Sequence, residues 1–158
     1  MSEKGFTLTE LLMVIVLIGI VGASVAPLLS DTTFFQKRFF LDEFSNMLRF
    51  AHKISTATGC DIVIKYKDNN HIGLYMKQNC TQGDFTRPIV SPYLIEAGSA
   101  YELVVPKIPP LVNLPIFIDK MGKVYNAQNR WQPEIVFSVD NQHIVIDGFS
   151  GFVYEKTT

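Results

Sequence analysis

The sequence predicts an α+β fold, in which a long N-terminal helix, transmembrane in its first half, packs on a small antiparallel β-sheet domain. Three observations lead to this prediction. Residues 6–30 are almost entirely apolar, and apolar residues then recur at helical spacing as far as Ile54. Beyond Gly59 the pattern changes to an alternation of period two, which is typical of half-buried strands.

The composition fits one membrane-length segment joined to one globular domain. The 158 residues are 47% hydrophobic with a mean hydropathy of +0.18, and both values are high for a soluble domain. The excess lies in residues 6–30, where Glu10 is the only ionisable side chain. The net charge is -1 and no basic stripe is present, so nucleic acid is an unlikely partner.

The apolar segment has the length of a membrane helix. Residues 8–29 exceed the roughly 20 residues that cross a bilayer core. Because Lys4 precedes the segment, we expect a cytoplasmic N-terminus and an exported C-terminal part. An ordinary cleaved signal is the alternative, since residues 22–24 and Ala26 resemble a small-residue cleavage site.

Glu10 is the first functional candidate, because a carboxylate inside an apolar span is costly unless it is paired or protonated. It lies five residues past Gly5, and a cut after Gly5 leaves a free ammonium on Phe6. A Glu10 carboxylate that meets the Phe6 ammonium of a neighbouring subunit neutralises both charges in hydrocarbon. In the alternative interpretation, Glu10 only reaches the headgroup region, one turn from the start of the span.

The run KGFTLTELL at residues 4–12 resembles the class III signal of type IV pilins and type II secretion pseudopilins. That signal is a short basic leader ending in Gly, then Phe, then Glu as fifth residue of the mature chain, followed by an apolar helix. The resemblance implies cleavage between Gly5 and Phe6 by the prepilin peptidase, N-methylation of Phe6, and assembly directed by Glu10. It also implies partners, namely other pilin or pseudopilin subunits, the inner-membrane assembly platform and membrane lipid.

This resemblance divides the chain into a leader peptide (1–5), a transmembrane or assembly helix (6–30) and a periplasmic or extracellular domain (31–158). The chain is then expected to cross the inner membrane once and to become part of a filament. The family's helix often loosens mid-membrane on assembly, and Gly19, Gly22 and Pro27 fit such a break. Alternatively, these residues are simply common in transmembrane helices.

The exported part is expected to begin with helix 31–58, which an interruption or a new cap at residues 31–33 divides from the apolar segment. Strands are expected at 61–67, 71–77, 101–105, 116–119, 123–125, 135–139, 143–147 and 151–155, completing one antiparallel sheet. Residues 116–154 are similar to minor pilins and pseudopilins of the GspH/FimT type. Among these, the chain looks most like a minor pilin of the mannose-sensitive haemagglutinin (MSHA) pilus.

Cys60 and Cys80 are expected to form a disulfide, since an exported domain reaches an oxidising compartment. Two buried free thiols are the alternative. The histidines His52, His71 and His143 do not stand at metal-ligand spacing, and no nucleophile motif is complete. We therefore expect no catalytic residue, no metal, no cofactor and no enzymatic activity.

The sequence thus predicts a minor pilin or pseudopilin subunit of a type IV pilus or a type II secretion system. Two alternatives remain. A pilus-associated adhesin or DNA-uptake pilin adds a binding role to the same scaffold. A simple membrane-anchored periplasmic domain has no role in a filament.

Overall fold

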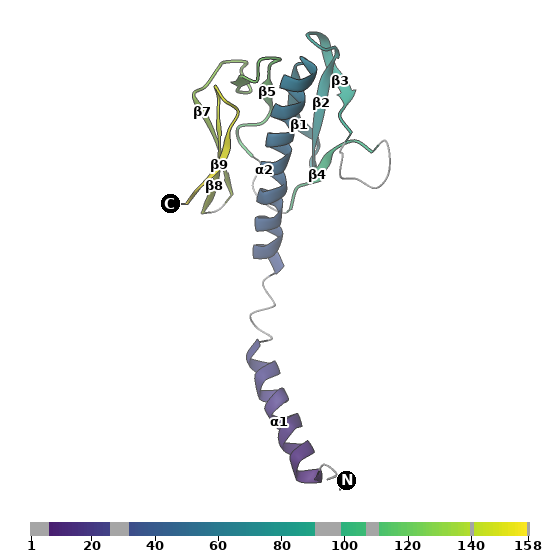
Figure 1. The fold of residues 1–158 in the computed structure, drawn as a ribbon, viewed down its shortest axis with the longest axis vertical. Helices are drawn as coiled ribbons and strands as arrows, with labels where there is room; N and C mark the ends of the chain where they lie inside the picture. Colours follow the sequence, from purple (N-terminus) through teal and green to yellow (C-terminus); the bar gives the residue numbers. More distant parts are fainter. Residues whose placement is uncertain (1–6, 26–31, 91–98, 107–110, 140, 158) are drawn as a thin grey trace, which may run out of the picture. The chain divides into compact units, whose positions relative to one another are not determined.

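The computed structural model describes residues 7–25, 32–90, 99–106, 111–139 and 141–157. By its internal contacts the chain divides into two units, residues 1–36 and residues 37–158. The second unit holds two β-sheets and most of the second helix (Figure 1).

Helix α1 (Leu8–Val25) forms most of what is described of the first unit. Its side chains from Leu8 to Gly22 are all exposed, and most of them are large and apolar. In the part of the chain that the structure describes, no helix combines the length and the hydrophobicity that a membrane crossing requires.

Helix α2 (Thr32–Thr58) ends where the sequence predicts. Gly59 follows it with φ 68°, a left-handed conformation that glycine adopts without steric cost, and its N–H bonds to the Ser55 carbonyl at 2.9 Å. Along one face of α2, side chains at helical spacing are buried: Phe40, Leu41, Phe44, Met47, Leu48 and Ala51. The other face carries exposed residues, among them Phe39.

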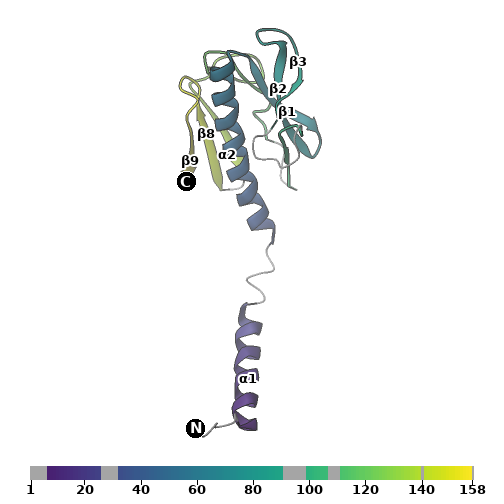
Figure 2. The ribbon, with the colours of Figure 1, turned by 45° about the vertical axis from the view of Figure 1, so that its right-hand side comes forward.

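Within the described residues, nine strands form two antiparallel sheets beside α2 (Figures 1 and 2). The large sheet has the order β3-β2-β1-β5-β6, with β4 also paired to β2. Its strands are β1 (Ile62–Asp68), β2 (His71–Asn79), β3 (Gln82–Pro88), β4 (Glu102–Val104), β5 (Ile116–Ile118) and β6 (Val124–Tyr125). The small sheet has the order β7-β8-β9, made of β7 (Glu134–Val139), β8 (Gln142–Asp147) and β9 (Val153–Thr157).

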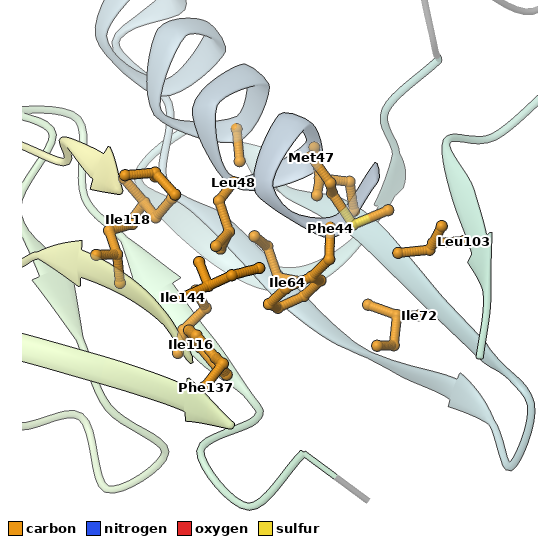
Figure 3. Close-up of a cluster of buried hydrophobic side chains, with 14 of the residues drawn as sticks. Phe44, Met47, Leu48, Ile64, Ile72, Leu103, Ile116, Ile118, Phe137 and Ile144 are labelled. Carbon is orange, nitrogen blue, oxygen red and sulfur yellow. The ribbon is translucent and has the colours of Figure 1, made fainter. Parts of the chain in front are cut away.

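One hydrophobic core joins α2 to both sheets. Figure 3 shows Phe44, Met47 and Leu48 of the helix pointing toward isoleucines of the large sheet and toward β7 and β8 of the small one. Phe44 is fully buried and meets Phe137 of β7 edge to face, with ring centroids 5.0 Å apart. The alternation of period two places every second residue of β7 in this core, as its burial pattern shows.

The α+β prediction is confirmed, and its details differ in two respects. The predicted single sheet is two sheets, because β7, β8 and β9 pair only with one another. The edge strand β3 was not predicted, since only Phe85 in it is even partly buried and its sequence shows no apolar alternation. The interruption or new cap predicted at 31–33 falls partly on residue 31, outside the described residues.

Candidate assembly site at the N-terminal helix

The first turn of α1 is closed by a reciprocal pair of hydrogen bonds between Thr7 and Glu10. The Glu10 N–H donates to Thr7 Oγ1 at 3.3 Å, and the Thr7 N–H donates to Glu10 Oε2 at 3.1 Å. The Thr7 hydroxyl also donates to Glu10 Oε2, at 3.0 Å. This arrangement is a capping box, in which the first and fourth residues satisfy each other's backbone donors.

The capping box gives Glu10 a role that the sequence analysis missed. The signal was present, because Thr7 and Glu10 stand in the spacing T-x-x-E directly before an apolar run. The carboxylate is therefore held at the helix N-terminus, next to residue 7, where the helix dipole also favours a negative charge. Its orientation is fixed by hydrogen bonds within its own chain.

Beyond the first turn, α1 presents apolar side chains in all directions. Its large apolar residues from Leu8 to Val21 are between 42% and 80% exposed. A helix that is hydrophobic all round is stable when other helices or lipid surround it, since burying each CH₂ contributes about 0.8 kcal/mol. The surface of α1 is thus suited to lateral packing in an apolar environment.

The sequence also predicts a cleavage site and a helix break in this segment. Gly5, Phe6 and Pro27 lie outside the described residues. Helix α1 runs without interruption through Gly19 and Gly22, and a Cβ added at either position meets no atom within 4 Å. The proposed helix break concerns the assembled filament, so it stays a prediction.

Cys60 and Cys80 form a disulfide in the second unit, with an S–S distance of 1.95 Å. The bond joins the end of α2 to the turn between β2 and β3. Beside it, the Asp61 N–H donates to the Cys80 carbonyl at 2.8 Å, and Lys77 Nζ lies 2.7 Å from Asp61 Oδ2. This pairing agrees with the expectation from the sequence.

The histidines lie on separate elements. His52 is half-buried on α2, His71 Nδ1 lies 2.9 Å from Asp68, and His143 Nδ1 lies 2.8 Å from Ser138 Oγ. Among the described residues, no group of three His, Cys, Asp or Glu side chains is placed to hold a metal ion.

Ser150, which stands in an incomplete nucleophile motif, has a turn role. Its N–H and its hydroxyl both donate to Asp147 Oδ1, each at 2.6 Å. This hydrogen bonding closes the turn between β8 and β9. The Ser150 hydroxyl thus donates its proton to a carboxylate of its own turn, Asp147.

Comparison with known proteins addresses the N-terminal segment. Residues 1–26 match the family described as the prokaryotic N-terminal methylation motif. No curated protein and no solved structure matches the chain. The motif is typical of structural subunits, and it implies processing by prepilin peptidase and assembly with other pilin subunits. Residues 1–26 therefore carry the class III prepilin signal that the run at residues 4–12 resembles, and this signal is consistent with a type IV pilin-like or pseudopilin chain.

Proposed function

We propose that this chain is a minor pilin or pseudopilin subunit of a type IV pilus or a type II secretion system. One observation carries the proposal: the methylation motif of residues 1–26 contains a capped helix, α1, whose large apolar side chains from Leu8 to Val21 are exposed. Such a helix is stable when neighbouring subunit helices or lipid cover it. The small domain that follows is then the exported part of the subunit.

Maturation creates the charge that Glu10 meets. Prepilin peptidase hydrolyses the bond between Gly5 and Phe6, and the new Phe6 ammonium becomes N-methylated. Thr7 already supplies two hydrogen bonds to one oxygen of the Glu10 carboxylate. Because an ionised carboxylate has about four acceptor sites, Glu10 keeps capacity for the Phe6 ammonium of a neighbouring subunit.

Residues 6–30 anchor the subunit in the inner membrane before assembly, with residues 31–158 on the periplasmic side. The assembly platform then transfers the helix from lipid into the filament. During this transfer the helix loosens at three positions, Gly19, Gly22 and Pro27. Glycine lowers helix propensity by about 1 kcal/mol, and proline removes a backbone hydrogen bond.

Helix α2 offers a second contact surface. Phe35 and Phe39 lie one turn apart, and their side chains are 62% and 63% exposed. Aromatic residues are enriched at the interfaces where subunits meet. We assign them to contacts with adjacent subunits, outside the core that Phe40 and Phe44 form.

Mass spectrometry of the mature N-terminus tests the proposal. The full chain is produced in cells with prepilin peptidase and, as a control, in cells that lack it. We expect an N-methylated Phe6 terminus only in the first case. An uncut Met1 terminus in both strains, or a cut near Ala26, would contradict the proposal.

Incorporation into filaments is the second test. The Glu10→Ala variant is expected to fold its exported domain, with the disulfide formed, but to be absent from sheared filaments. Normal incorporation of this variant would remove the role assigned to Glu10.

A further inference from the structure

The face of the large sheet that points away from α2 carries an aromatic surface with a cleft. On β1, Ile62 and Ile64 belong to the core beneath α2, so Val63 between them faces the other way. Val63 is still only 1% exposed. Its cross-strand partners are Tyr75 of β2 and Phe117 of β5, and these two half-buried aromatic residues flank it on that face.

Next to this surface lies a cleft of about 490 Å³. That volume is within the range of small-molecule sites, roughly 300–1,000 Å³. Its lining combines aromatic rings with polar groups: Asp61, Lys77, Phe85, Phe117, Ile118, Asp119, Tyr125 and Asn129. Phe85 and Phe117 form its apolar part, with ring centroids 5.5 Å apart at an angle of 48°.

The carboxylates of the cleft are fixed by their own chain. Asp119 Oδ1 accepts the N–H groups of Met121 and Lys123 at 2.8 and 2.9 Å, and its Oδ2 accepts the Tyr125 hydroxyl at 3.0 Å. Asp61 Oδ1 accepts the Lys120 N–H at 3.1 Å. Fixed acceptors lose little conformational entropy when a ligand binds, and each carboxylate keeps unused lone pairs.

Donors lie beside these acceptors. Lys77 Nζ bonds to Asp61 Oδ2 at 2.7 Å and to the Thr81 carbonyl at 3.1 Å, so one of its three protons remains. Asn129 is exposed, and its side-chain amide makes no hydrogen bond to another described residue. Its φ of 56° belongs to a tight turn, in which its own N–H donates to the Asn126 carbonyl at 2.9 Å.

We propose that this cleft binds a neutral saccharide, with the C–H face of a sugar ring against Phe117 and Phe85 and its hydroxyls on Asp61, Tyr125 and Asn129. A sugar ring has an apolar face and an edge of groups that both donate and accept, which matches this lining. The two carboxylates and one ammonium of the lining sum to a charge of -1. That balance disfavours acidic ligands. The proposal does not depend on the processing of Phe6 or on Glu10.

The test uses the full mature chain in a zwitterionic detergent without a sugar headgroup. A panel of immobilised neutral and acidic glycans identifies ligands, and methyl glycosides of neutral hexoses are then titrated. Trp131, the only tryptophan, pairs with Tyr125 through a β-bridge and serves as the fluorescence reporter.

Three variants probe the cleft. We expect Phe117→Leu to weaken binding about tenfold by removing an aromatic face, and Tyr125→Phe about fivefold by removing a hydroxyl. Asn129→Gly keeps the left-handed backbone conformation, and it is expected to weaken binding about fivefold. Phe152→Leu, an exposed aromatic position directly before β9, is the matched control and should bind normally.

Neutral glycan binding that these variants weaken and the control retains supports the proposal. No binding of any neutral glycan, equal binding by all variants, or retention of acidic glycans alone overturns it. Asn129→Gly changes only an exposed side chain, so it decides the matter even if Phe117→Leu folds poorly.

Discussion

The imidazole ring of His52 occupies the space that a side chain on Gly151 would fill. A Cβ built on Gly151 overlaps the ring carbons of His52, and one built on Gly122 meets its Nε2 atom. Gly122 lies in the turn between β5 and β6, and Gly151 in the turn between β8 and β9. His52, half-buried on α2, thus packs against one turn of each sheet.

Substitution of Gly151 by alanine is expected to destabilise the domain by about 3 kcal/mol or more. Its φ of 66° adds backbone strain of about 1–2 kcal/mol to the steric overlap with His52. Gly83→Ala is the matched control, since its φ is 83° but the nearest atom to the new Cβ lies 3.5 Å away. The free energy of unfolding is measured with urea. An equal decrease for both variants would mean that the overlap with His52 contributes nothing.

The stability of the domain should fall as the pH drops below about 6.5, and His52 is the cause. Burial lowers the pKa of His52 from its ordinary value of 6.5, and a hydrogen bond to the backbone of Gly122 offsets part of this effect. The unfolded chain therefore binds a proton at a higher pH than the folded chain does. Stability is complete above pH 6.5 and decreases as the pH falls through the pKa of the folded state.

His52→Gln tests this pH dependence, because glutamine fills part of the same space and does not titrate. The urea midpoint of the wild type should decrease between pH 7.5 and pH 5, while that of the variant stays nearer constant. Parallel curves for the two proteins would assign the pH dependence to other groups.

The fold was predictable wherever one residue pattern decided the structure. Gly59 ends α2 as predicted, and β7 shows the full alternation that its sequence indicates. The pairing of strands was harder, since no local signal says that β5 joins β1 while β7 does not join β6. Such pairings depend on contacts that are distant in sequence, as between Phe44 and Phe137.

The sequence indicated where the candidate site lies, since residues 1–26 match the methylation motif, but not its local geometry. The roles of Gly5, Phe6 and Glu10 in processing and assembly stay predictions. The bond between Glu10 and Thr7 was readable from the spacing T-x-x-E, but a charge in an apolar run suggested only an intermolecular partner. The cleft at Phe117 had no sequence signal, because its lining comes from five separate segments of the chain.

Two phenylalanines of α2 should respond very differently to truncation. Phe44 is fully buried and stacks on Phe40 as well as Phe137, so Phe44→Ala is expected to cost about 3–5 kcal/mol. Phe39 is 63% exposed, and Phe39→Ala should change the free energy of unfolding by less than about 0.5 kcal/mol. Urea unfolding monitored by Trp131 fluorescence measures both. A large loss for Phe39→Ala would place its ring in the core rather than on the surface.

Removal of the disulfide should cost about 3 kcal/mol, the chain-entropy value for a loop of this length, since Cys60 and Cys80 are separated by 20 residues. The double variant Cys60→Ser/Cys80→Ser removes it without leaving a free thiol. Its urea midpoint should be lower than that of the wild type and unaffected by reductant, while reductant lowers the midpoint of the wild type. A wild type insensitive to reductant under unfolding conditions would show that the bond adds no stability.

The two roles of Glu10 can be separated by comparing two substitutions. Glutamine at N3 still completes a capping box, so Glu10→Gln keeps the bonds to Thr7 and loses only the charge. Glu10→Ala loses both. If neutralisation of the Phe6 ammonium drives assembly, the two variants should be equally absent from filaments, and the release of the leader should be normal in both.

Thr7→Ala supplies the complementary variant, because it removes the hydroxyl that accepts the Glu10 N–H and leaves the carboxylate in place. We expect the loss of this cap to weaken α1 by about 1 kcal/mol and to leave incorporation near normal. Thr9→Ala, whose hydroxyl contacts only that of Thr7 among the described hydrogen bonds, is its control. Incorporation is measured by quantitative mass spectrometry of sheared filaments, after processing of each variant has been checked. Normal incorporation of Glu10→Gln together with failure of Thr7→Ala would assign Glu10 to helix capping and remove its proposed contact with the Phe6 ammonium.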